Sequence, residues 1–318
     1  KGESMSVMLD EPESQTTQSQ GNRLQAETTA VRLHIRWPGT RKSLSRDQKQ
    51  QAAGAFDADS RTLSAAKRLI DTSHPAFRAV SAVKTKASSL WKGMTLPYIE
   101  PGVRLLRRCD VSEFDSQMIN IQDELSESVT ELDRCFSELI DSARGQLGHL
   151  FDPADYPSTV SDLFAVSWDF PSVTPPAYLR TVNPELYQHE CQRVKERFAE
   201  AVELAEQTFA EELSQLVNHL AERLSGSIDG KPKVFRDSAV TNLNEFFERF
   251  QRLNIGSSEE LDELVDSARQ VISGVSPQDL RDRGSLRQQV AASLTRVESC
   301  LDELMSDRPR RNVLRGPR

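Results

Sequence analysis

The sequence has little of what identifies most enzymes, metal proteins and membrane proteins. It contains four cysteines in 318 residues, with no CxxC pair and no cluster of cysteine and histidine. This spacing argues against a zinc site and a disulfide framework, and it indicates a reducing, cytoplasmic location. No apolar run approaches the roughly 20 residues of a membrane span. Residues 1–29 have no apolar signal core, and we expect them to be a disordered tail.

Motifs for catalysis are also absent from the sequence. There is no Walker phosphate loop, no GxGxxG after a strand, no GxSxG and no HExxH. His189, Glu190 and Cys191 are adjacent, but consecutive residues of a helix point in different directions and do not converge. We therefore expect a protein that is not an enzyme, with no catalytic residue, no cofactor and no metal. An enzyme with a site between the two regions defined below is the less favoured alternative.

What the chain does contain is long amphipathic helices. Aromatic residues make up 6% of the chain and charged residues 28%, a composition typical of helical proteins. Residues 183–226 predict one helix, with Asn183 as N-cap, Pro184 at the first position and Gly226 after the end. Its apolar or small residues recur in steps of three and four: Tyr187, Cys191, Val194, Phe198, Val202, Ala205, Phe209, Leu213, Leu216, Leu220 and Leu224.

A second helix is predicted over residues 111–150, with apolar spacing close to that of a coiled coil. The simplest arrangement is an antiparallel hairpin of the two long helices over residues 109–226, with residues 151–183 crossing over. Pairing between two chains along the same seam is the alternative. The fold prediction is mainly α, with a small α+β head, this long coiled-coil-like hairpin and C-terminal helices at 233–306.

The predicted head covers residues 30–108. Residues Val31 to Trp37 alternate strictly between apolar and polar, which predicts a half-buried strand. Helices are expected at about 45–55, 60–71 and 75–91, and a β-hairpin on either side of Glu100-Pro101-Gly102. The last residues, 307–318, are basic and contain two prolines, so a disordered tail is expected there.

Charge is divided unevenly along the chain. Residues 31–108 contain 16 lysines and arginines against 5 acidic residues, whereas residues 109–306 contain 17 against 37. The cations of the head are candidate contacts for nucleic-acid phosphates or for an acidic partner: Arg61, Lys67, Arg68, Arg78, Lys84, Lys86, Lys92, Arg104, Arg107 and Arg108. The tail adds Arg308, Arg310, Arg311, Arg315 and Arg318. No base-reading motif stands out, so binding to nucleic acid would be independent of sequence.

The basic head has three roles to choose among besides nucleic-acid binding. The cations could meet an acidic protein partner, or the acidic helices of a second copy of the chain. They could also be ordinary solvated helix faces that differ in charge.

The crossover at 151–183 is rich in proline and aromatic residues. Its aromatics either plug the end of the helical pair or form an exposed tip that docks a protein. The candidate docking residues are Tyr156, Phe164, Trp168 and Phe170.

Short strings give the chain a family resemblance over roughly residues 30–250. They are WPGTRKSL at 37–44, SLWKGMTLPYIEPGVRLL at 89–106, the long helix that follows, and Tyr156-Pro157. This order resembles an uncharacterised bacterial and phage family of helical proteins, encoded beside MoxR-type AAA+ ATPases and von Willebrand factor A proteins. The resemblance implies a cytoplasmic accessory protein, a substrate or adaptor of such an ATPase. It carries no catalytic residues, and it does not reach the region after about residue 255.

The sequence therefore predicts a non-enzymatic helical scaffold or adaptor with a protein partner, possible homo-oligomerisation and no membrane association. The alternative is a sequence-independent nucleic-acid-binding protein that uses the basic head.

Overall fold

A computed structural model describes residues 11–228, 231–232, 235–254 and 256–307. The fold is mainly helical, with 67% helix and eleven α-helices among the described residues. Its described residues form two compact units. Unit 1 takes in Lys1–Ala30, Met94–Arg108 and Pro171–Arg318, and unit 2 takes in Val31–Gly93 and Cys109–Phe170. Within the described part, no helix is both long and apolar enough to cross a membrane.

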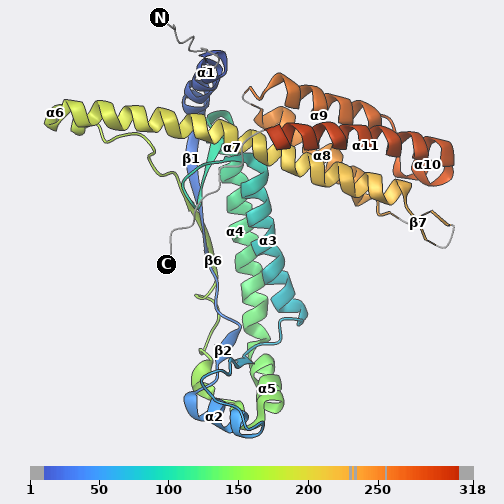
Figure 1. Cartoon of the computed structure of the whole chain (residues 1–318). Helices are drawn as coiled ribbons and strands as arrows, with labels where there is room; N and C mark the ends of the chain where they lie inside the picture. Colours follow the sequence, from blue (N-terminus) through green and yellow to red (C-terminus); the bar gives the residue numbers. More distant parts are fainter. Residues whose placement is uncertain (1–10, 229–230, 233–234, 255, 308–318) are drawn as a thin grey trace, which may run out of the picture. The chain divides into compact units, whose positions relative to one another are not determined.

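Unit 1 is built around one long helix, α7 (Pro184–Ser225), on which α11, α1 and α8 pack (Figure 1). The other elements of the unit are α1 (Glu11–Glu27), β4 (Thr95–Pro97), β5 (Val103–Arg107), α6 (Leu179–Val182), β7 (Ser227–Ile228), β8 (Lys231–Pro232), α8 (Ser238–Leu253), α9 (Glu259–Ile272), α10 (Pro277–Asp282) and α11 (Gly284–Asp307). Strands β4 and β5 form an antiparallel hairpin, as predicted.

The predicted helix at 183–226 is confirmed, and so are its end signals. The Asn183 side chain accepts a hydrogen bond from the Leu186 amide at 3.0 Å, and Pro184 occupies the first position. From Val194 onward the helix buries an apolar stripe that ends at Leu224. Phe209 lies at its centre and makes edge-on contacts with Phe246 and Phe250 of α8. Packing of this stripe therefore holds unit 1 together.

A buried arginine from α11 caps the carboxyl end of α7. Arg287 donates from Nε to the Leu224 carbonyl at 2.8 Å and from Nη2 to the Arg223 carbonyl at 2.7 Å. These carbonyls belong to the last turn, which has no partners within the helix. A cation at this end is also favoured by the helix dipole. Burial lowers the pKa of the Arg287 guanidinium.

We expect Arg287→Met to lower the stability of unit 1 by about 1–3 kcal/mol, because buried carbonyls lose their donors. Arg283→Met is the matched control, since the Arg283 side chain is 69% exposed and its ion pair with Asp279 lies at the surface. Urea unfolding followed by circular dichroism measures both. Equal small losses in the two variants would show that the cap contributes little.

The predicted N-terminal tail needs a correction. Residues 1–10 lie outside the described residues, but residues 11–27 form α1, which packs along α7. Leu24 is buried at 1% exposure. A Cβ atom at Gly21 would lie 2.9 Å from the Ala199 amide nitrogen of α7. The helix is held by close backbone approach and a few apolar contacts, which a largely polar sequence does not announce.

Gly21→Ala is expected to destabilise unit 1 by about 1–3 kcal/mol and to speed proteolysis within α1, since the added methyl group meets backbone and not a flexible side chain. Gly145→Ala in α5 is the control. Nothing lies within 4 Å of a Cβ at Gly145, so the same change there should be neutral or stabilising by about 0.4–1 kcal/mol. If both variants behave alike, the close approach of α1 to α7 is not required.

Unit 2 combines two helices with short antiparallel strands. Its elements are β1 (Thr28–Arg36, which enters from unit 1), β2 (Arg41–Ser43), α2 (Arg46–Gly54), β3 (Ala66–Arg68), α3 (Pro75–Met94), α4 (Val111–Arg134), α5 (Phe136–Leu147) and β6 (Ala165–Asp169). Strand β1 pairs with β6, with Leu33 opposite Trp168, and β2 pairs with β3. Helices α3 and α4 lie side by side (Figure 1).

Several sequence predictions for this region were wrong. The helix expected at 60–71 is absent, and Ala66–Arg68 pair as β3 with β2 instead. The single helix over 111–150 is two helices that meet at Cys135. The crossover at 151–183 contains a strand, β6. The expected head at 30–108 is divided between the two units.

The antiparallel hairpin of the two long helices is not confirmed. Helices α4 and α5 belong to unit 2, whereas α7 belongs to unit 1 and packs there on α11, α1 and α8. The C-terminal helices predicted at 233–306 are confirmed as α8 to α11. The tail at 308–318 lies outside the described residues.

Candidate functional site

The charge asymmetry of the sequence is largely cancelled within unit 2. Residues 31–93 contain 13 lysines and arginines against 4 acidic residues, and residues 109–170 contain 2 against 14. Both segments fold into the same unit, which therefore holds 15 basic and 18 acidic residues. Much of the acidic partner that the charge pattern predicted is supplied by the same chain.

Three of the ten candidate cations lie in unit 1 and bind the protein itself. Arg104 donates from Nε to Thr95 Oγ1 at 2.7 Å and from Nη2 to the Thr95 carbonyl at 2.8 Å. Burial, together with the nearby charge of Arg249, lowers the pKa of Arg104 to about 10. Arg107 donates to the Arg252 carbonyl, and Arg108 Nε donates to the Thr28 carbonyl at 3.1 Å. All three are structural in the free protein.

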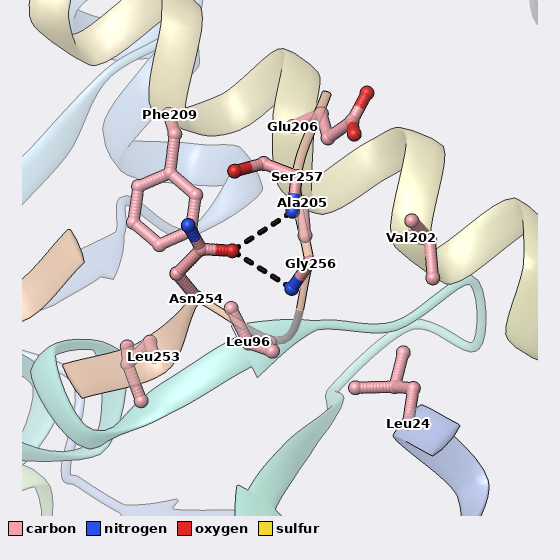
Figure 2. Close-up of a pocket in the computed structure, with 10 residues that line it drawn as sticks. All are labelled: Leu24, Leu96, Val202, Ala205, Glu206, Phe209, Leu253, Asn254, Gly256 and Ser257. Atoms are coloured by element: carbon pink, nitrogen blue, oxygen red, sulfur yellow. Dashed lines mark hydrogen bonds between the residues drawn. The ribbon is translucent and has the colours of Figure 1, made fainter. Parts of the chain in front are cut away.

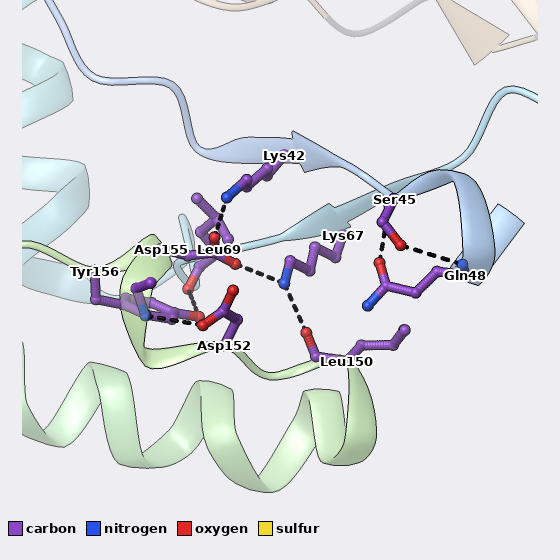
Figure 3. A network of polar contacts seen from close by, with 10 residues as sticks. Lys42, Ser45, Gln48, Lys67, Leu69, Leu150, Asp152, Asp155 and Tyr156 are labelled. Carbon is purple, nitrogen blue, oxygen red and sulfur yellow. Dashed lines mark hydrogen bonds and ion pairs between the residues drawn. The ribbon is translucent and has the colours of Figure 1, made fainter.

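In unit 2, Lys67 is buried in a polar network (Figure 3). Its side chain is 5% exposed and pairs with Asp155, whose side chain is fully buried. Lys67 Nζ also donates to the Leu150 carbonyl at 2.7 Å. Lys42 pairs with the same carboxylate from the surface. Lys67 therefore joins the β2–β3 hairpin to residues 150–155 and cannot reach an external phosphate.

The two lysines shift the titration of this network. Hydrogen bonds from Lys42 and then Lys67 lower the pKa of Asp155 below its ordinary value. The bond to Asp155 raises the pKa of Lys42. Asp155 is thus an anion throughout the physiological range and serves to anchor the hairpin.

The remaining cations lie on the surface of unit 2, and four of them are on α3. This helix carries Arg78, Lys84, Lys86 and Lys92 and no acidic residue. Lys86 Nζ pairs with Glu124 of α4 at 2.5 Å, and Lys84 Nζ lies 5.2 Å from the centre of the Trp37 ring. Outside α3, Arg61 pairs with Asp59 3.3 Å away and Arg68 is exposed on β3.

The aromatic residues proposed as a docking tip are mostly packed inside unit 2. Tyr156 donates its hydroxyl to the Leu69 carbonyl at 3.0 Å. Phe164 is 6% exposed and meets the Trp37 ring edge-on. Trp168 donates from Nε1 to Asp115 of α4 at 3.0 Å. Phe170 alone among the four is well exposed, at 42%. These aromatics fasten the crossover to α4 and β1.

The structure reveals an apolar surface that sequence reasoning missed. We call residues 175–193, which include α6 and the first turns of α7, the arm. None of its residues is buried, although it is helical over most of its length. Tyr178 is 65% exposed, Val182 75% and Leu186 43%. In Figure 1 this end of α7 extends away from α8, α9 and α11 of the same unit. The steps of four between these residues were the available signal.

Two hollows occur among the described residues. One in unit 1, of about 320 Å³, has an apolar floor that includes Leu24, Leu96 and Phe209 (Figure 2). The polar groups at its edge are engaged in the α8–α9 loop. Asn254 Oδ1 accepts from the amides of Gly256 and Ser257, and Glu206 accepts from the Ser258 amide at 2.7 Å. No reactive set of side chains converges there.

The other hollow is an open groove of about 600 Å³ in unit 2, between α4 and residues 161–166. Its lining mixes hydroxyl and apolar side chains, and Gln122 crosses one end to donate to the Val166 carbonyl at 2.7 Å. Over the residues that are described, no group of three histidine, cysteine or acidic side chains is arranged to hold a metal ion.

Comparison with known proteins adds no further assignment. Neither a protein-family model, nor a curated protein, nor a solved structure matches the chain.

Proposed function

We propose that this protein is a non-enzymatic helical adaptor that binds a protein partner through the arm. The observation that carries this proposal is the exposure of Tyr178, Val182 and Leu186 on a well-formed helical segment. Exposed apolar side chains grouped on one rigid element are typical of protein-binding surfaces. The remainder of α7 buries its apolar face within unit 1, so the arm is held out by a packed base.

The resemblance of residues 30–250 names the partner to test first. We propose a cytoplasmic accessory role beside a MoxR-type AAA+ ATPase or a von Willebrand factor A protein of a bacterium or phage. The arm would enter an apolar groove of the partner as a helix, with its large side chains as anchors.

The direct test mixes the purified chain with a MoxR-type ATPase and, separately, with a von Willebrand factor A protein, and follows complex formation by light scattering after gel filtration. The proposal expects a complex with at least one of them. The absence of any complex with both would contradict the ATPase-accessory role.

A second candidate function, sequence-independent binding of nucleic acid, is favoured by one observation. Helix α3 presents four cations without an acidic residue. Unit 2 as a whole carries no excess of positive charge, so such binding would depend on this helix and not on the net charge of the head.

A further inference from the structure

We propose that the outward face of α3 binds the phosphate backbone of nucleic acid. This inference rests on the second candidate function and assigns its site. We define the α3 ridge as Arg78, Ala82, Thr85, Ser89 and Lys92, none of which is buried. With 3.6 residues per turn these five positions fall on one side of the helix. The opposite side is buried in unit 2 and includes Ala76, Phe77, Val80, Val83, Ala87 and Met94.

The ridge is a line of positive charge with no opposing carboxylate on its own helix. Arg78 and Lys92 are separated by 14 residues, or about 21 Å along the helix axis. Phosphates follow one another every 3.4 Å of axis along each strand of a duplex, so the ridge spans about six of them. Lys84 and Lys86 flank the ridge, where the contacts with Trp37 and Glu124 hold them against the unit.

The side chains between the cations favour nucleic acid over an acidic protein. They are small or carry hydroxyls: Ala79, Ser81, Ala82, Thr85, Ser88 and Ser89. Arginine, lysine, serine and threonine are the residues that contact phosphates. A protein interface would be expected to place large apolar or aromatic anchors at its centre. The ridge has none, and the exposed large apolar residues of the described chain lie elsewhere.

The other predicted cations are less suited to the same role. Lys67 is buried, and Arg104, Arg107 and Arg108 donate to backbone or side-chain oxygens of unit 1. A nucleic acid that binds the described surface should therefore depend on Arg78 and Lys92 first.

The test compares the full chain with two double variants, each of which removes two positive charges from unit 2. Arg78→Gln with Lys92→Gln alters the ridge. Arg46→Gln with Arg61→Gln alters exposed cations away from α3 and is the matched control. Binding of a labelled random-sequence DNA duplex is followed by fluorescence anisotropy over a series of salt concentrations. Circular dichroism checks that both variants are folded.

The ridge variant should bind about 10-fold more weakly at low salt, and its slope of log affinity against log salt should be shallower by about 1.8, because each phosphate contact contributes about 0.9. The control should keep the affinity and slope of the natural chain. If the control weakens as much as the ridge variant, the α3 assignment is overturned while nucleic-acid binding stands.

Two further results would overturn the proposal in other ways. Failure of the natural chain to bind DNA at low salt would remove both the site and the second candidate function. Displacement of the DNA by poly-glutamate at equal charge concentration would identify the ridge as a site for an acidic protein. Neither result would affect binding of a protein partner through the arm.

Discussion

Replacing Tyr178, Val182 and Leu186 together by glutamine should weaken binding of the partner at least about 100-fold, since buried apolar anchors supply most of the binding free energy of an interface. The folded state should not change. All three side chains are largely in solvent, and surface substitutions usually alter stability by less than about 0.5 kcal/mol. Isothermal titration calorimetry with the partner, beside thermal unfolding of the variant, measures both quantities.

The matched control makes the same substitution at the exposed apolar residues of unit 2, namely Phe56, Ile119 and Phe170, which are 83%, 45% and 42% exposed. It should bind like the natural chain. If this control loses affinity and the arm variant keeps it, the docking surface lies in unit 2, where the sequence first suggested it around Phe170.

Asp155→Ala should destabilise unit 2 by about 3 kcal/mol, because it leaves the buried ammonium group of Lys67 without its carboxylate. The β2–β3 hairpin should then exchange its amides faster. Asp141→Ala is the control, as the Asp141 side chain is 71% exposed and pairs with Arg144 at the surface. That surface pair should be worth at most about 1 kcal/mol. Adding Lys67→Met to Asp155→Ala should restore part of the loss, and a failure to do so would indicate that cavity formation is the cause.

The same network predicts how stability depends on pH. The pKa of Asp155 is lower in the folded protein, so its contribution is present above the ordinary carboxylate pKa and is lost as pH falls through the folded value. The pKa of Lys42 is raised, so its contribution is lost only as pH rises above the ordinary lysine range. The network should therefore stabilise unit 2 across neutral pH and fail in acid, and Asp155→Ala should flatten the acid limb of the stability profile.

Local signals in the sequence predicted the individual helices well. The ends of α7 follow from Asn183, Pro184 and Gly226, which have the same effect in any long helix. Helices α8 and α9 were equally clear from their apolar stripes. Strand β6 was hidden because five alternating residues within a proline-rich segment give too short a pattern. Helix α1 was missed because its largely polar sequence has only a weak apolar face.

What periodicity cannot supply is the identity of the partner that a helix packs against. The stripe of α7 fits α4 as well as α11 in the sequence, but packing within unit 1 gives it α11. The same limit applies to charge. A count along the chain shows a basic head, but only the fold shows that residues 109–170 neutralise it within unit 2. Of the candidate site residues, the structure buries Lys67 and Phe164 and leaves Arg78 and Lys92 at the surface.

The measurement that tests the central claim most directly is amide hydrogen exchange of the full chain with and without the partner ATPase. The adaptor account predicts new protection confined to residues 175–193, where no side chain is buried in the free protein. Protection on the helices that pack against α7, with none at the arm, would contradict it.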